Sequence, residues 1–173
     1  MRCKKKSAGR ECNSRRGLHG ETMTIEEKYS KLKAKYNLPD FRELNNAFEI
    51  SLIEKDEFFL REIRRKIADK IGFFSAIMAG AISPECSPGA VIEFGNIDDD
   101  DAKKAFDVYK KLMYWERCSA QNAAICDEKK DAEFIRELNE AWKTLKNDVA
   151  EILEKLKEAW KKKTAKENGA YLL

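Results

Sequence analysis

Two groups of side chains in this sequence could bind a ligand, one made of arginines and the other of aromatic residues with an arginine. They are Arg61, Arg64 and Arg65 in one stretch, and Tyr114, Trp115 and Arg117 in a later one. Guanidinium groups bind carboxylates and phosphates through paired hydrogen bonds. If the fold brings the two groups together, we expect a patch for an anion or RNA. The alternative is a set of surface salt bridges between these arginines and Glu57, Glu62 and Asp69, with Trp115 partly buried.

The run of four aspartates from Asp98 to Asp101 is a second chemical feature. Carboxylate oxygens suit Mg²⁺ or Ca²⁺, but consecutive side chains point in different directions, and the glycine of an EF-hand loop is missing. An N-cap followed by acids in the first turn of a helix accounts for the run without an ion. We therefore predict a helix start here.

The cysteines and the single histidine do not form a recognisable metal site. Cys3, Cys12 and His19 have loose spacing and no evident fourth ligand. Cys118 and Cys126 are eight residues apart, which is about 12 Å along a continuous helix and too far for a disulfide. We interpret these two as small core residues, and we expect neither a metal nor a cofactor.

The position of His19, near the beginning of the chain, limits the enzyme mechanisms open to this protein. Histidine-based acid–base catalysis, Ser-His or Cys-His pairs, and a bundle di-metal site with Glu-x-x-His motifs would each need a histidine in the later part. No glycine-rich phosphate loop is present either. An enzyme would have to work with carboxylate, arginine and tyrosine groups alone.

The most clearly predicted element is a long amphipathic helix from Asp131 to Lys163, against which the helices that carry the candidate residues would pack. Its apolar residues alternate three and four apart, the pattern of a coiled-coil seam. They are Ile135, Leu138, Trp142, Leu145, Val149, Ile152, Leu156 and Ala159, with Leu153 and Trp160 widening the stripe. Such a helix would be roughly 45–50 Å long and must bury its stripe against other helices.

Earlier helices are predicted from capping signals and apolar spacing. Thr24 and Glu27 form a capping box that opens a helix ending near Tyr36. Asp40 is the N-cap of a second helix, which we expect to continue to Ile82. Its stripe contains Leu44, Phe48, Leu52, Phe59, Ile63, Ile67 and Ile71. Its end, with Gly80 between two alanines, would permit close approach of another backbone.

The next part of the chain contains an irregular stretch and then a third helix. Prolines and glycines punctuate residues 83–97, so we expect Ala90–Phe94 to lie extended over the bundle. The third helix begins after Asp98, with Ala105, Phe106, Tyr109, Leu112, Met113 and Ala120 facing inward. We predict a break near Ala124–Asp131, because the small residues before it would pack against the bulky residues after it as a helical hairpin. The alternative is one unbroken helix, which length statistics disfavour.

These elements predict an all-α fold, an antiparallel bundle of about four helices over residues 23–166, with residues 167–173 frayed. Residues 1–22 are expected to form a disordered basic tail, since they hold almost no apolar side chains. Its main cations are Lys4, Lys5, Lys6, Arg15 and Arg16. The alternative is that Met23 is the native start and the tail is not in the native protein.

Composition points to a cytoplasmic protein without a membrane span. The five cysteines are scattered, no apolar signal segment precedes them, and no apolar run approaches about 20 residues. Charged residues make up 38% of the chain, against about 25% typically. This excess of Lys and Glu suits exposed helix faces and also leans toward a thermophilic source.

The function predicted from these features is that of a non-catalytic helical interaction or assembly module, through a protein partner or self-association. The long seam and the absence of a histidine from the helical part support this prediction. The alternative is an RNA- or ribosome-associated protein that uses the basic tail and the arginine edge. A histidine-independent enzyme with an Arg/Tyr/carboxylate site in the bundle is the third hypothesis.

Overall fold

Helices make up most of the described part of the chain. The structure, a computed structural model, describes residues 23–54, 57–82, 88–95 and 97–161. Its elements are α1 (Ile25–Tyr36), α2 (Phe41–Phe48), the 3₁₀ turn η1 (Ile50–Leu52), α3 (Phe59–Ile82), α4 (Pro88–Phe94), α5 (Asp99–Ile125) and α6 (Glu128–Lys161). No strand occurs in these residues, so the predicted all-α class is confirmed. The predicted tails at 1–22 and 167–173 lie outside them.

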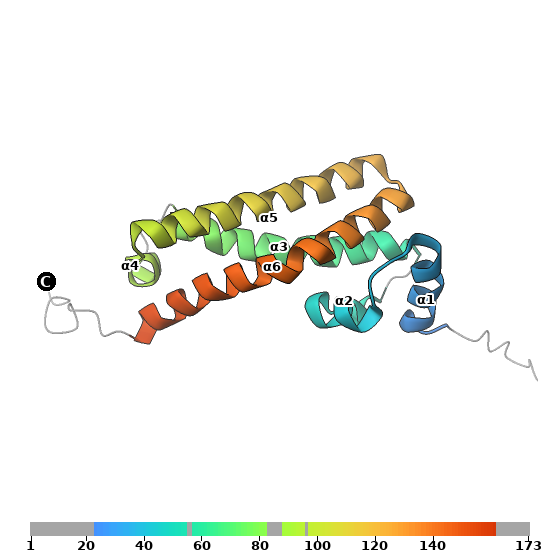
Figure 1. Cartoon of the computed structure of the whole chain (residues 1–173), viewed down its shortest axis with the longest axis horizontal. Coiled ribbons are helices and arrows are strands. Elements are labelled where there is room, and N and C mark those ends of the chain that lie inside the picture. The colour runs from blue at the N-terminus through green and yellow to red at the C-terminus, as the bar shows by residue number, and fades with distance from the viewer. Residues whose placement is uncertain (1–22, 55–56, 83–87, 96, 162–173) are drawn as a thin grey trace, which may run out of the picture.

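Three long helices, α3, α5 and α6, form the body of the bundle (Figure 1). α5 and α6 are an antiparallel hairpin, and α3 packs against both. Contacts of Arg64 with Asp131 and of Phe74 with Trp142 show that α3 and α6 run in the same direction. Every residue of the predicted seam is buried, which confirms that the stripe of α6 faces the core. Trp160 is the exception among the flanking residues, at 55% exposed.

The predicted helix starts are present with their capping bonds. The Thr24 side chain accepts a hydrogen bond from the Glu27 N–H at 3.2 Å, and Glu27 accepts one from the Thr24 N–H at 2.8 Å. Asp98 accepts from the N–H groups of Asp100 at 3.1 Å and Asp101 at 2.8 Å. The aspartate run therefore serves as an N-cap and first turn, where carboxylates complement the helix dipole.

The predicted break between the last two helices is confirmed. Cys126 takes a left-handed conformation with a φ of 58° and ends α5. The side-chain amide of Asn122 donates to the Lys130 carbonyl at 2.9 Å and ties the two sides of the turn together. Cys126 is exposed, so the prediction that it fills the core is wrong, because its place in the turn lies beyond the packed part of the hairpin.

The prediction of one continuous second helix is wrong, because α2 ends at Phe48 and α3 begins at Phe59. Glu49 is left-handed with a φ of 55°, and the Asn45 side chain accepts a hydrogen bond from the Ser51 N–H at 2.7 Å. A short polar side chain can thus satisfy backbone groups outside the helix and end it. Leu52, counted in the predicted stripe, is 62% exposed.

Residues 88–94 form helix α4, so the expectation of an extended segment there is wrong. Pro88 is the first residue of α4, a position where a missing N–H carries no penalty. A Cβ added at Gly80 would lie 2.8 Å from Cζ of Phe94, so Gly80 makes room for an aromatic ring and not for a backbone. Phe106 and Ala120 are also exposed, against the prediction.

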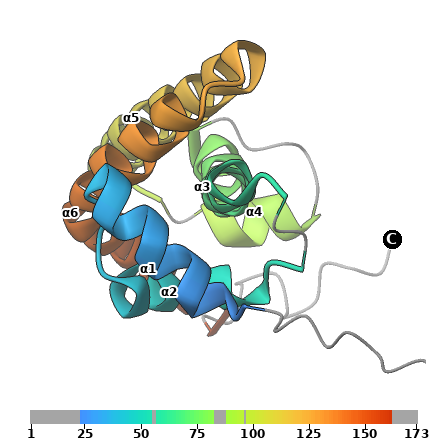
Figure 2. The same cartoon turned by 90° about the vertical axis from the view of Figure 1, so that its right-hand side faces the viewer.

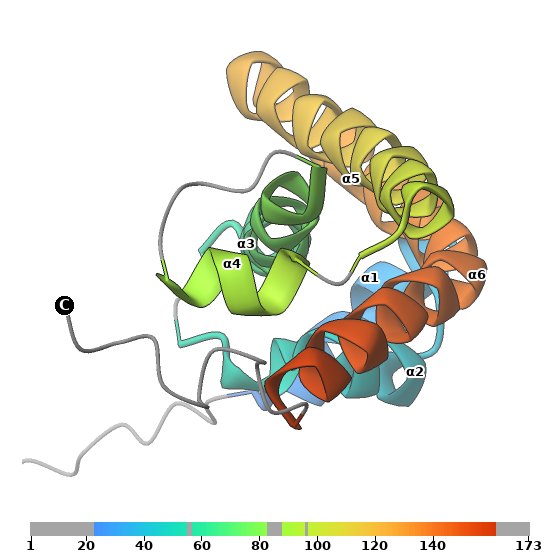
Figure 3. The same cartoon turned by 90° about the vertical axis from the view of Figure 1, so that its left-hand side faces the viewer.

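The short helices cover different parts of the α3–α6 pair. α1 and α2 lie together beside one end of the bundle (Figure 2), and α4 lies beside α3 at the other (Figure 3). Arg136 of α6 donates to the Tyr36 carbonyl at 3.0 Å, and Lys70 of α3 donates to the Ala47 carbonyl at 2.7 Å. None of the described helices is both long and apolar enough to cross a membrane.

Candidate functional site

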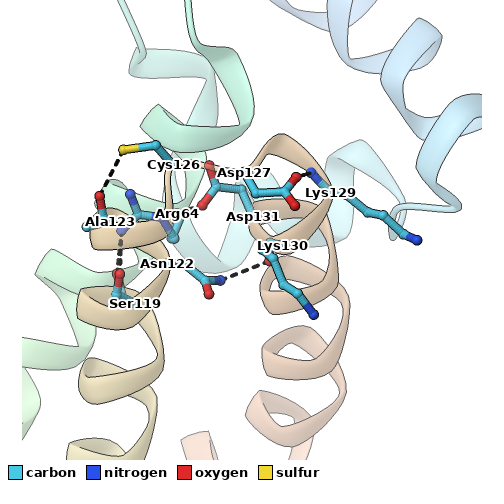
Figure 4. Close-up of polar contacts among 9 residues, drawn as sticks. All are labelled: Arg64, Ser119, Asn122, Ala123, Cys126, Asp127, Lys129, Lys130 and Asp131. Carbon is cyan, nitrogen blue, oxygen red and sulfur yellow. Dashed lines mark hydrogen bonds and ion pairs between the residues drawn. The ribbon is translucent and has the colours of Figure 1, made fainter.

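Arg64, predicted as part of a surface edge, is buried at 3% exposed. Its Nε donates to Asp131 Oδ1 at 2.6 Å, and its Nη1 donates to both the carbonyl and the Oγ of Ser119 at 2.8 Å (Figure 4). The three residues come from α6, α5 and α3, so this buried cluster ties the long helices together. Arg64 cannot belong to an exposed patch, because it lies on the inward face of α3 with Ile63 and Ile67.

Burial determines the electrostatics of the cluster. Removal from water raises the pKa of Asp131 above its usual value, although the charge and hydrogen bond of Arg64 act to lower it. The ion pair therefore lies in a poorly solvated place, where each charge would be costly to bury without the other. With its donors directed at Asp131 and Ser119, Arg64 has a structural role in this geometry.

An open pocket of about 340 Å³ lies beside the buried cluster, and Asp131 is one of its lining residues. Arg61 lies at this pocket with its guanidinium carbon 4.6 Å from the Phe58 ring centroid, and its buried Nε has no hydrogen-bond partner among the described residues. Glu57 and Glu128 line the pocket as well, so carboxylates outnumber the arginine. A lining with more carboxylates than guanidinium groups disfavours the binding of an anion.

The second predicted group lies on α5 and is only partly at the surface. The Tyr114 ring is exposed and meets the Trp115 ring edge-on, with centroids 5.2 Å apart. Trp115 in turn packs on Phe134 of α6 at 5.9 Å, and Arg117 is exposed. In the residues described, no hydrogen bond, ion pair or ring contact joins this group to the arginines of α3. A shared anion or RNA patch stays a prediction.

The other predicted binding residues are placed as follows. Arg65 is exposed and pairs with Glu62 at 3.1 Å, which is the salt-bridge alternative. The basic tail with Lys4, Lys5, Lys6, Arg15 and Arg16 lies outside the described residues. Within the described ranges, no group of three or more His, Cys, Asp or Glu residues could hold a metal ion.

A further candidate site is a groove between α2, α3 and α6, with a volume of about 490 Å³. We call it the α2–α3–α6 groove. Its floor is apolar, with the Phe74 ring stacked on Trp142 at a centroid distance of 5.8 Å. Its lining residues are Glu43, Asn46, Ala47, Lys70, Phe74, Asn139, Trp142, Lys143, Lys146, Val149, Ala150 and Leu153.

Lysines form much of the polar rim of the groove, and they differ in their partners. Lys143 is paired with Glu140 at 2.7 Å and lies 3.6 Å from Glu43. Lys70 donates to the Ala47 carbonyl and has no carboxylate partner in the part of the chain that is described. Lys146, on the α6 side of the rim, has no hydrogen bond or ion pair with any described residue.

The sequence analysis did not single out this groove, although one signal for it was present. Leu153 lies outside the three-four seam of α6 and widens its stripe toward a second neighbour. It is only partly buried, on the groove wall. The sequence could not show that α2 ends at Phe48 and leaves Leu153 of α6 only partly covered.

Comparison of the chain with family models, with curated proteins and with solved structures found no match.

Proposed function

We propose that this protein is a non-catalytic helical interaction module that binds a partner protein along the α2–α3–α6 groove. The observation that carries the proposal is the apolar floor of this groove, where Leu153 and Phe74, the latter stacked on the buried Trp142, are only partly covered. It lies between α2, α3 and α6. Amphipathic helices gain their stability by burying such surface, so an open stretch of it favours association.

The polar groups of the groove fit binding better than catalysis. Its lining contains no histidine or cysteine, and its one carboxylate, Glu43, accepts a hydrogen bond from Asn139 at 3.1 Å and faces Lys143. A nucleophile beside a base, the usual arrangement for covalent catalysis, does not occur among these residues. Apolar floors with a few polar groups at the rim are typical of binding sites.

The alternative of RNA binding has less support from the described residues. Arg64 is committed to Asp131 inside the bundle, and Arg65 pairs with Glu62. Arg61 then contributes the remaining guanidinium of the predicted edge, beside a pocket rich in carboxylates. Nucleic-acid binding needs several cations on one face, so we keep RNA as an outcome that the experiment can detect.

The test compares two variants that place a charged side chain at an exposed alanine. Ala150→Glu lies on the groove wall, and Ala120→Glu lies on an exposed face of α5 and serves as the matched control. Each full-length protein is immobilised and exposed to native lysate with and without nuclease. We expect a protein partner that the wild type and Ala120→Glu retain, that Ala150→Glu loses, and that nuclease does not release.

Two results would overturn this proposal. Equal retention of every partner by Ala150→Glu and the wild type would mean that the groove is not the contact surface. Release of all bound material by nuclease would favour the RNA alternative, because the partners would then be held through nucleic acid.

A further inference from the structure

The length of the α2–α3–α6 groove fits a helix. On α6 its lining residues run from Asn139 to Leu153, which corresponds to about 21 Å at a rise of about 1.5 Å per residue. A partner helix of the same length has about 14 residues, or about four turns. Helices that pack in bundles approach to about 8–10 Å between axes, so their side chains fill the space between them.

A helix also fits the groove better than an extended peptide does. Extended peptides usually bind by adding a strand to the edge of a sheet, and the described residues contain no strand. The groove walls are helices whose backbone groups are already bonded within each helix. A bound segment must therefore satisfy its own N–H and C=O groups, which an α-helix does and a strand does not.

The charges at the rim identify the chemistry of the partner. Elsewhere on α6 the lysines are largely matched, with Lys130 on Glu133, Lys155 on Asp101, Lys157 on Glu154 and Lys161 on Glu158. Lys70 on α3 and Lys146 on α6 both line the groove and have no carboxylate partner among the described residues. Lys70 uses one of its three donors on the Ala47 carbonyl, so it can still bind an acid.

We infer that the partner is an amphipathic α-helix that lays an apolar face on Phe74, Trp142 and Leu153 and sets acidic side chains against Lys70 and Lys146. This inference rests on the proposed function and adds the chemistry of the partner to it. The floor supplies the apolar burial, and the two lysines favour acidic flanks over basic ones through charge complementarity. Anchors at i, i+3, i+4 and i+7 place the apolar face of such a helix along the floor.

The experiment uses three labelled peptides of about 16 residues, long enough to span the groove. All three carry the same leucine face, and their flanking positions hold Glu, Gln or Lys. Fluorescence anisotropy measures their binding to the full chain as wild type, Lys70→Glu/Lys146→Glu, Ala150→Glu and Ala120→Glu. Circular dichroism and sedimentation of each variant monitor its folding and its oligomeric state.

Three results are expected if the inference is right. The Glu peptide binds the wild type at least about tenfold more tightly than the Lys peptide, and added salt reduces the difference. The double charge reversal inverts this preference while the variant stays folded. Ala150→Glu weakens binding of the Glu peptide, whereas Ala120→Glu leaves it unchanged.

Other results overturn the inference and separate it from the proposed function. Equal binding of the three peptides, with Ala150→Glu still inhibitory, rejects the acidic partner but leaves the groove as an interaction site. Binding that Ala150→Glu does not change rejects both. If no peptide binds and the protein itself dimerises through a contact that Ala150→Glu abolishes, the occupant is a second copy of this chain and the acidic helix is rejected.

Discussion

Two polar regions of this bundle differ in whether their charged side chains are buried and paired. In the buried cluster, Arg64 and Asp131 are almost without contact with water. Arg64 donates to Asp131 and also to Ser119. In the α2–α3–α6 groove, Lys70 and Lys146 stand at an open rim without a carboxylate partner among the described residues. The first region joins the three long helices through paired charges, and the second has two ammonium groups that no carboxylate of the described residues pairs.

The difference follows from solvation. A charge removed from water is strongly destabilising unless a partner is held close to it, so the buried pair is sensitive to the loss of either member. A lysine at an open rim keeps most of its hydration, and its interactions are weak and screened by salt. The comparison predicts that substitutions in the cluster change stability and that substitutions at the rim change binding.

The largest effect is expected for Arg64→Met, which leaves Asp131 buried without its cation. We expect the free energy of unfolding to fall by about 3–5 kcal/mol, measured by chemical denaturation. The control is Arg65→Met one residue along α3, where the exposed pair with Glu62 should contribute less than about 1 kcal/mol. A similar small loss for both variants would show that Asp131 does not depend on Arg64.

The same variant should acquire a distinctive pH dependence. Burial already raises the pKa of Asp131, and removing Arg64 takes away the charge that opposes this rise. The folded variant then binds the proton more tightly than its unfolded chain does. The stability that this bound proton contributes is fully present below the usual aspartate pKa of about 3.9. It is lost as the pH rises through the raised pKa of Asp131, by up to about 1.4 kcal/mol per pH unit.

Denaturation of Arg64→Met and the wild type at pH 7 and pH 5 measures this dependence. We expect the difference in their free energies of unfolding to be smaller at pH 5, because protonated Asp131 is less costly to bury without Arg64. The double variant Arg64→Met/Asp131→Asn is the control, since it has no carboxyl to titrate at this position. A difference that is constant with pH would mean that Asp131 gains solvent or another cation in the variant.

A middle-sized effect is expected for Ser119→Ala, which removes one of the two acceptors of Arg64 Nη1. The backbone carbonyl of residue 119 stays in place, so Arg64 is not left without an acceptor there. We expect a loss of about 1 kcal/mol, the usual contribution of one hydrogen bond, in the same denaturation assay. A loss as large as that of Arg64→Met would instead show that the hydroxyl is essential for holding the ion pair.

The buried cluster could have been suspected from the sequence, but its pairing could not. Arg64 lies four residues after Leu60 and three before Ile67, on the apolar stripe of α3. Asp131 lies four residues before Ile135, where the seam of α6 would continue. Charges of opposite sign on two buried stripes suggest an ion pair. Which stripes meet, and at what height, depends on how the helices pack, and the spacing alone does not contain that information.

The groove was less predictable than the cluster, because it depends on where a helix ends. The caps at Thr24 and Asp98 and the seam of α6 were predictable, since each rests on local spacing and local hydrogen bonds. The end of α2 depends on Asn45, whose side chain bonds to the Ser51 N–H. Apolar spacing continued across that point, so the sequence predicted one helix where the structure has two.

The smallest effect on stability is expected at Lys146. In the described part of the chain it makes no hydrogen bond or ion pair, and it is exposed on the groove wall. Lys146→Met keeps the length of the side chain and its helix propensity while removing the charge. We therefore expect a change in the free energy of unfolding within about 0.5 kcal/mol.

The informative experiment at Lys146 measures peptide binding and the free energy of unfolding in the same variant. In Lys146→Met, binding of the Glu-flanked helical peptide should weaken, by up to about fivefold for one exposed charge, while stability stays unchanged. Lys143→Met is the matched control on the same helix, because Lys143 already has Glu140 and Glu43 as partners and its charge is less available. Equal weakening in the two variants would mean that the peptide responds to the net charge of α6. A clear loss of stability in Lys146→Met would remove the contrast between the rim and the buried cluster, since the rim lysine would then be part of what holds the fold together.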